Sequence, residues 1–167
     1  MAELWDAYNK NFNKIENKTL IRGESIPDGA YHLVSEIVVK HTDGSYLLMQ
    51  RDFRKHHGGK WELTAGGSAL QGEDELEAAV RELKEETGAV DFNIKPVCVY
   101  SVKGKTRVNN NATKESFGML YAAEIFSFEE IHSEIEKIVL SDDLIRQWTY
   151  PLIQPKLISE AKKRGYL

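Results

Sequence analysis

The sequence predicts an α/β protein, a sandwich with a mixed β-sheet. Strand-like and helix-like segments follow one another without regular βα alternation, which is typical of a mixed sheet. The chain of 167 residues has the usual length of one domain and is long enough to bury a hydrophobic core. We therefore expect residues 1–167 to form a single domain, with residues 1–30 as an N-terminal extension packed on it.

The N-terminal extension carries the aromatic residues Trp5, Tyr8 and Phe12 at helical spacing. This spacing predicts a short amphipathic helix. Its aromatic face could cover the domain core or bind a partner chain, and we favour the core. Homodimerisation is the alternative.

Strands are expected in the segments that follow. Residues Tyr31–Lys40 and Tyr46–Arg51 have strand character, and the turn Thr42–Ser45 between them predicts a hairpin. Two further strands are expected at Val97–Val102 and Ser116–Phe126.

The C-terminal third predicts two helices, Asp142–Trp148 and Lys156–Arg164, with Pro151 and Pro155 breaking the chain between them. The segment Ile131–Leu140 fits a helix or a strand equally well.

The central segment predicts an amphipathic helix. Its apolar stripe consists of Leu76, Ala79, Val80 and Leu83. Asp74 suits the N-cap, with Glu77 three residues later as in a capping box, and Gly88 suits the left-handed position after the helix. Glu86 and Glu82 are expected roughly 70° and 110° from the centre of the stripe, at the border of the buried face.

Three carboxylates, Glu82, Glu85 and Glu86, gather within one and a half turns of this helix. Like charges at this density raise the free energy of the site unless cations neutralise them, and oxygen ligands suit a hard cation. We expect Mg²⁺, with Mn²⁺ as an alternative, and phosphate as its partner. Arg81 lies four residues from both Glu77 and Glu85, so its guanidinium is expected to orient carboxylates.

The spacing of these residues resembles the Nudix box. The matching positions are Gly67, Glu73, Arg81, Glu82, Leu83, Glu85, Glu86 and Gly88, and the box departs from the family pattern only in its last position, where Ala89 replaces a bulky aliphatic residue. The resemblance implies a Nudix-type α/β/α sandwich, with a mixed β-sheet between helices, and hydrolysis of a diphosphate linkage. It also implies that Mg²⁺ is bound by Glu82, Glu85, Glu86 and the carbonyl of Gly66.

The resemblance further implies roles for single residues. Glu82 is the first choice for the general base, with Glu134 and Glu136 as alternatives. Glu73 is expected to support the structure, and Arg81 to orient the catalytic carboxylates Glu82 and Glu85.

Further segments look similar to the branch grouped with isopentenyl-diphosphate isomerases. They are Trp5–Tyr8, Arg22–Glu24, Tyr31–Leu33 and Trp61–Gly67. Those isomerases use a Cys and a metal-binding His where this chain has Gly66 and Ser68. Because Gly66 cannot supply a thiol, the resemblance favours hydrolysis over isomerisation.

Two loops carry clustered basic residues. The first contains Arg51, Arg54, Lys55, His56, His57 and Lys60, with Asp52 as its only acid. We interpret Arg51, Arg54 and Lys60 as ligands for substrate phosphate, and a solvated loop is an equal alternative. His56 and His57 are not expected to bind metal, and Trp61 is expected in the core. A second loop with Lys103, Lys105 and Arg107 is interpreted as solvated, with closure over a ligand as the alternative.

The overall composition excludes several classes. The net charge of −4 gives no attraction to nucleic acid polymers, and no apolar run approaches 18 residues, so neither a nucleic acid nor a membrane is expected as a partner. The acidic start of the chain is unlike a signal peptide, which predicts a cytoplasmic protein. The single Cys98 cannot form a disulfide within the chain and is expected to be buried.

The sequence therefore predicts a Mg²⁺-dependent enzyme that cleaves a diphosphate linkage in a small molecule, a nucleoside diphosphate derivative or a related metabolite. An isomerase and a non-catalytic nucleotide-binding module are the alternatives. The leaving group stays open, with Tyr100, Phe117 and Tyr121 as aromatic candidates for its recognition.

Overall fold

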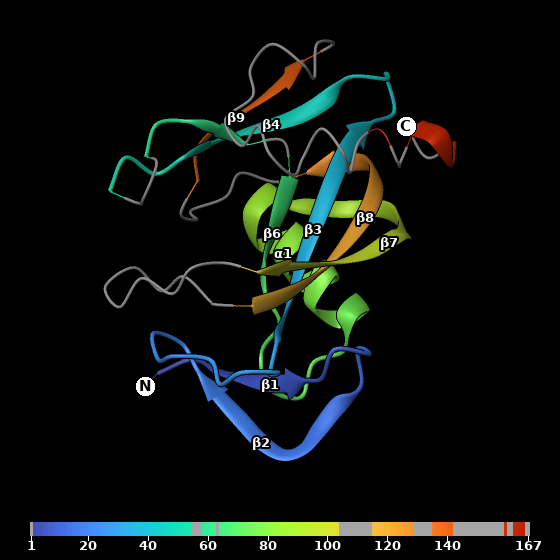
Figure 1. The fold of residues 1–167 in the computed structure, drawn as a ribbon. Helices are drawn as coiled ribbons and strands as arrows, with labels where there is room; N and C mark the ends of the chain where they lie inside the picture. The colour runs from blue at the N-terminus through green and yellow to red at the C-terminus, as the bar shows by residue number, and fades with distance from the viewer. Residues whose placement is uncertain are drawn as a thin grey trace.

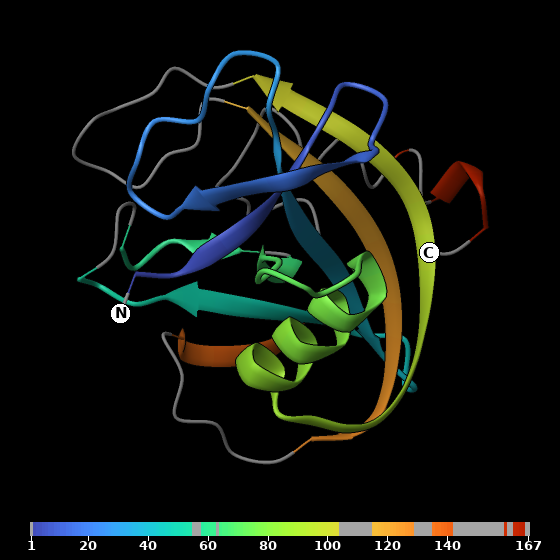
Figure 2. The same ribbon diagram turned by 90° about the horizontal axis from the view of Figure 1, so that it is seen from below.

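The computed structural model describes residues 2–54, 58–62, 64–103, 115–128, 135–141, 159 and 162–165. Within these residues, one long helix, α1 (Glu75–Thr87), packs against a seven-stranded sheet, and a separate two-stranded hairpin lies beside them (Figures 1 and 2). The hairpin consists of β1 (Leu4–Tyr8) and β2 (Lys14–Ile21). The sheet contains β3 (His32–His41), β4 (Tyr46–Arg51), β5 (Trp61–Glu62), β6 (Thr64–Ser68), β7 (Ala89–Lys103), β8 (Glu115–Phe128) and β9 (Ile135–Ser141).

Strand β3 is the centre of the sheet. It pairs in parallel with β8, from His32 opposite Ser116 to His41 opposite Ile125, and antiparallel with β6 on its other edge. The remaining pairings, β7 with β8 and β4 with both β5 and β9, are antiparallel. The predicted mixed sheet of an α/β protein is therefore confirmed.

The predicted hairpin of β3 and β4 is confirmed at its turn, where His41 N–H donates to the Ser45 carbonyl over 2.8 Å. Beyond the turn the two strands share a single backbone pair, Lys40 with Tyr46. They separate because β6 takes the edge of β3, whereas β9 and β5 take the edges of β4 (Figure 1).

The helix predicted in residues 1–30 is wrong, because Trp5 and Tyr8 lie on β1. Trp5 and Ala7 belong to one hydrophobic cluster, whereas Tyr8 packs in another, so the two faces of the strand are both covered. The chain then reverses at Phe12, whose φ is 64°, and Asn9 Oδ1 accepts the N–H groups of Asn11 and Asn13. These local side-chain bonds favour a turn over a helix.

The C-terminal predictions are only partly covered by the described residues. The ambiguous segment is a strand, β9, from Ile135 onward. The expected helix Asp142–Trp148 lies outside the described residues, and within Lys156–Arg164 residues 159, 162 and 163 are helical. No helix among the described residues is long and apolar enough to span a membrane.

The main core lies between α1 and the sheet. It contains Ile37, Val39, Leu47, Met49, Ala65, Ala79, Leu83 and Ala89. Because Ile37 and Val39 face α1, the alternation of a strand places Glu36 and Val38 on the opposite face of the sheet. Cys98 on β7 is half-buried rather than buried, so that prediction is wrong.

Candidate functional site

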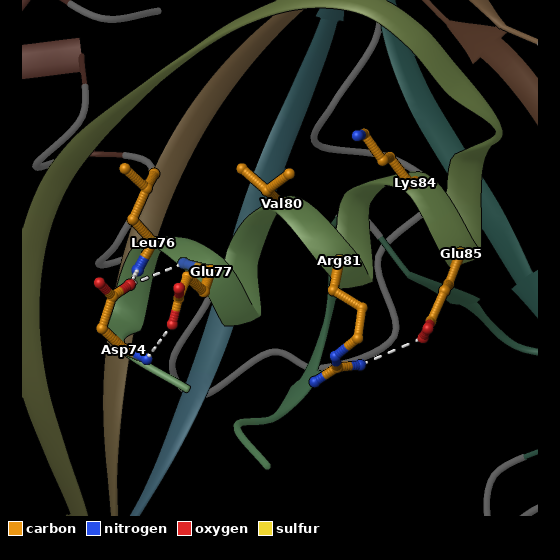
Figure 3. Close-up of a pocket in the computed structure, with 7 residues that line it drawn as sticks. All are labelled: Asp74, Leu76, Glu77, Val80, Arg81, Lys84 and Glu85. Atoms are coloured by element: carbon orange, nitrogen blue, oxygen red, sulfur yellow. Dashed lines mark hydrogen bonds and ion pairs between the residues drawn. The ribbon is translucent and has the colours of Figure 1, made fainter. Parts of the chain in front are cut away.

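Helix α1 begins and ends as its sequence predicts. The Asp74 carboxylate accepts the N–H groups of Leu76 (2.9 Å) and Glu77 (2.8 Å), and the Glu77 carboxylate accepts Asp74 N–H (2.9 Å). This capping box is visible in Figure 3. Gly88 adopts the left-handed conformation with φ 68°, and its N–H donates to the Lys84 carbonyl. These bonds fix the register in which α1 presents its carboxylates.

The buried face of α1 is rotated from the prediction. Ala78, Ala79, Leu83 and Thr87 are buried, whereas Leu76 is 47% exposed. Glu82 and Glu86 therefore lie within the arc that faces the sheet rather than at its border. The reason is tertiary, because small side chains on the helix and glycines on β6 allow a close approach: a Cβ on Gly67 would lie 2.5 Å from Glu82 Oε1.

Glu86 is the most deeply placed carboxylate of the box. Its Oε2 accepts the N–H of Gly66 over 2.7 Å. The pKa of Glu86 is raised to about 8, chiefly by burial and also by the neighbouring carboxylates of Glu82 and Glu62, against the opposing effects of the Gly66 N–H and Arg51. Burial also raises the pKa of Glu82, which its bond to Arg81 partly offsets. Burial thus disfavours the ionised forms of Glu82 and Glu86, and the nearby hydrogen-bond donors offset this only in part.

Arg81 connects most of the remaining acids. Its guanidinium donates to both oxygens of Glu73 (2.6 and 2.9 Å), to Glu82 Oε1 (2.7 Å), to Glu85 Oε2 (3.1 Å) and to the Ser68 carbonyl (3.0 Å). The bond from Arg81 lowers the pKa of Glu73. The structure therefore brings Arg81 together with Glu82 and Glu85, and Glu73 takes the place that the sequence suggested for Glu77.

The predicted phosphate ligands Arg51 and Arg54 both bind acids. Arg51 Nη1 lies 2.7 Å from Glu62 Oε1, and the exposed Arg54 side chain pairs with Asp52. The exposed Lys60 gives only a backbone contact, in which its carbonyl accepts Arg51 N–H over 2.9 Å.

Several of the candidate residues are not among those that the structure describes. Lys55, His56, His57, Lys105, Arg107 and Glu134 lie outside them, as do the side chains of Glu136, Phe117 and Tyr121. Trp61 is half-buried on β5.

Sequence reasoning missed two carboxylates of the sheet, Glu36 and Glu62. Burial raises the pKa of Glu36 on β3 and of Glu62 on β5, and the Tyr100 hydroxyl donates to Glu36. Among the described residues, Glu36 Oε2 is buried without a hydrogen-bond partner. The available signal was a single carboxylate inside the apolar run of β3.

A pocket of about 640 Å³ runs along the outer side of α1 (Figure 3). It is lined by Asp74, Leu76, Glu77, Val80, Arg81, Lys84 and Glu85. Only Arg81 and Glu85 join it to the acidic cluster, since Glu82 and Glu86 face the sheet. The pocket and the buried carboxylates are therefore separate features of α1.

The carboxylates of the box fit a divalent cation by their chemistry but are not gathered around one point. In the described part of the chain, no three potential ligand side chains lie close enough together to hold a metal ion. Arg81 and the Gly66 N–H bind the carboxylates separately. The carboxylates of Glu82 and Glu86 nevertheless suit a hard cation, because they are oxygen donors. The pKa of both is raised, so a bound cation would stabilise their ionised forms.

Comparisons with known proteins point to one family. The model of the NUDIX domain matches residues 30–155. An uncharacterised Nudix hydrolase of Listeria innocua is 41% identical over 87 residues, which are 52% of this chain and 51% of that protein. The matched region thus spans about half the length of this curated relative.

Solved structures agree in fold. A pyrophosphohydrolase of Bacillus subtilis matches with a TM-score of 0.64 and 20% identity, over 96% of this chain and 98% of that one. The Nudix domain of Shewanella oneidensis NrtR, complexed with ADP-ribose, matches with a TM-score of 0.62 and 19% identity, over 81% and 88% of the two chains. Together with the box residues gathered around Arg81, the family match over most of the sequence establishes that this chain belongs to the Nudix family.

Proposed function

We propose that the protein is a Mg²⁺-dependent hydrolase that cleaves a diphosphate linkage in a nucleoside diphosphate derivative or a related small metabolite, with Mn²⁺ as an alternative metal. The observation that carries the proposal is the partly buried pair Glu82 and Glu86, held by Arg81 and by Gly66 N–H. Family membership supports the reaction class. The net charge of −4 favours a small substrate over a nucleic acid polymer. A cytoplasmic location is part of the proposal.

The proposed roles follow from the contacts. Glu82, Glu85, Glu86 and the Gly66 carbonyl would hold the cation, which when bound neutralises phosphate oxygens and lowers the pKa of water. Arg81 orients Glu82 and Glu85 through two of its donors. Glu82 would take the proton of the attacking water, and Glu134 and Glu136 stay alternatives for this step.

The basic loop would bind the phosphate oxygens that the metal leaves free. For Arg51 and Arg54 this requires exchange of their present partners, Glu62 and Asp52, for phosphate. Lys60 is exposed, and the structure records no ion pair of its side chain that phosphate would have to displace. Phosphate can replace a carboxylate at a guanidinium group because it also accepts two parallel N–H bonds from that group.

The test is a panel of diphosphate metabolites incubated with Mg²⁺ and analysed by mass and by coupled phosphate release. We expect Glu82→Gln and Glu86→Gln to lower kcat by roughly 10² to 10⁴-fold. The matched control is Glu77→Gln, the same change on the same helix, because glutamine also completes a capping box. Full turnover by both site variants would disprove the proposal.

We further propose that the chain is related to the isomerase branch but lacks isomerase activity. The surroundings of Gly66 disfavour that activity, because its φ is 152° and a Cβ there would lie 2.0 Å from the Ser35 carbonyl oxygen. A cysteine thiol at this position would need the backbone to move. Incubation with isopentenyl diphosphate should give no allylic isomer. A nucleotide retained with unchanged mass after long incubation with Mg²⁺ would instead favour a non-catalytic binding module.

A further inference from the structure

The N-terminal hairpin contacts the loop that leads into α1, residues 69–74. Gln71 N–H donates to the Leu4 carbonyl, and Gly72 N–H donates to Asp6 Oδ2, both over 2.8 Å. The Gln71 side chain adds a bond of 2.8 Å to Thr19 Oγ1 on β2. Strand β1 therefore holds the backbone of this loop at two adjacent residues.

Asp6 is buried, and its carboxylate is held by two partners. Its side chain is 7% exposed, and the same Oδ2 that accepts Gly72 N–H lies 2.5 Å from Lys14 Nζ. Gly72 has a φ of 92°, a conformation that few other residues adopt. A buried carboxylate needs such partners, so Asp6 and the loop conformation depend on each other.

The loop carries the main partner of Arg81. Glu73 Oε2 accepts Leu70 N–H over 2.8 Å, which orients the carboxylate within the loop. Both oxygens of Glu73 then accept bonds from Arg81, which also donates to Glu82. The contacts thus run without a gap from Asp6 through the loop to the proposed general base.

A second route connects β1 with the same guanidinium. The Trp5 ring stacks on His32, with ring centroids 4.4 Å apart. His32 Nε2 lies 3.2 Å from Ser68 Oγ, and the Ser68 carbonyl accepts Arg81 Nη2 over 3.0 Å. Trp5 and His32 are both 2% exposed, so this stack has little room to move.

We propose that β1 is a positioning element of the active site, in which Asp6 and the Trp5–His32 stack hold the two acceptors, Glu73 and Ser68, that orient Arg81 and through it Glu82. The inference rests on the proposed function for its kinetic consequence. The hairpin precedes residues 30–155, the part of the chain that the family model matches. Asp6 and Trp5, which start the two contact routes, therefore lie outside the matched domain, whereas His32 lies inside it.

The experiment compares Asp6→Ala with Asp6→Asn, which keeps an acceptor for Gly72 N–H. We expect Asp6→Ala to lower kcat on the order of 10- to 100-fold with KM nearly unchanged, because a small misplacement of catalytic groups acts on the chemical step. Asp6→Asn should retain most of the wild-type kcat. In an Arg81→Lys background, Asp6→Ala should have little additional effect, since both changes act through one contact chain.

Glu16→Ala is the matched control, because it removes an exposed carboxylate of β2 for which the structure records no contact to the loop or to Trp5. A readout that needs no turnover is the NMR signal of Arg81 Nε–H, which should lose protection from solvent exchange in Asp6→Ala but not in Glu16→Ala. Unchanged protection in folded Asp6→Ala, or an equal loss in Glu16→Ala, would overturn the inference. If the wild type cleaves no diphosphate, the proposed function fails while this NMR comparison still decides the positioning role.

Discussion

Gly66 and Gly67 are neighbours on β6, yet a methyl group at each would meet a different obstacle. At Gly67 the added Cβ would lie 2.5 Å from Glu82 Oε1, the end of a flexible side chain. At Gly66 it would lie 2.0 Å from the Ser35 carbonyl oxygen, which belongs to the central strand, and the φ of 152° is itself unsuited to alanine. A methyl group at Gly67 would therefore displace the side chain of the proposed general base, whereas one at Gly66 would displace backbone.

We predict that Gly67→Ala and Gly66→Ala separate activity from stability. Gly67→Ala should change the free energy of unfolding by less than about 1 kcal/mol but lower kcat on the order of 100-fold, because Glu82 must move. Gly66→Ala should lower the free energy of unfolding by about 3 kcal/mol, because backbone must move. Urea denaturation and steady-state kinetics on both variants check this, and the reverse order of the two effects would contradict it.

Contacts between residues could be predicted from the sequence where they depend on spacing along one helix. The contact of Arg81 with Glu85 is an example, since four residues separate them on one helix. The bond from Arg81 to Glu73 joins the helix to the loop before it, and the Gly66 N–H that binds Glu86 comes from β6. Helical periodicity contains no information about either partner.

Helix α1 is the element whose limits the sequence predicts best, because its caps depend on neighbours within four residues. Asp74, Glu77 and Gly88 all make the expected bonds. Strand β1 is the opposite case. Trp5 and Tyr8 have helical spacing, but pairing with β2 and burial on both faces stabilise an extended strand.

At this scale we predict that Asp74→Ala lowers the free energy of unfolding by about 1 kcal/mol, because two N–H groups of the first turn lose their acceptor. Asp74→Asn should cost less, since asparagine also caps helices. Thermal or urea denaturation measures both variants. Equal stability of Asp74→Ala and wild type would show that the cap is not needed once the helix is packed.

The whole molecule should respond to pH through its buried carboxylates. The pKa of Glu86 is about 8 in the folded protein, against an ordinary value of 4.5. Between these values the folded state binds more protons than the unfolded state, so the free energy of unfolding falls as pH rises from 5 to 8. Burial raises the pKa of Glu82, Glu36 and Glu62 and adds to the same trend.

We predict that the metal-free protein loses up to about 1.4 kcal/mol of stability per pH unit in this window for Glu86 alone. Glu86→Gln should flatten the dependence of the free energy of unfolding on pH. In the wild type, saturating Mg²⁺ should restore the stability lost near pH 8, because the cation binds the ionised carboxylates. Urea denaturation in EDTA and in Mg²⁺ measures the effect. Stability that rises between pH 5 and 8 without metal would refute the assignment to Glu86.

The sequence by itself determined the family, the α/β class, the limits of α1 and the acids of the box, because each depends on local spacing or on local hydrogen bonds. Tertiary structure alone decided that Glu82 and Glu86 face the sheet, that β3 pairs in parallel with β8, and that β1 contacts the loop before α1. These contacts join residues far apart in the chain. Their free energy comes from burial and pairing between elements, which no local pattern records.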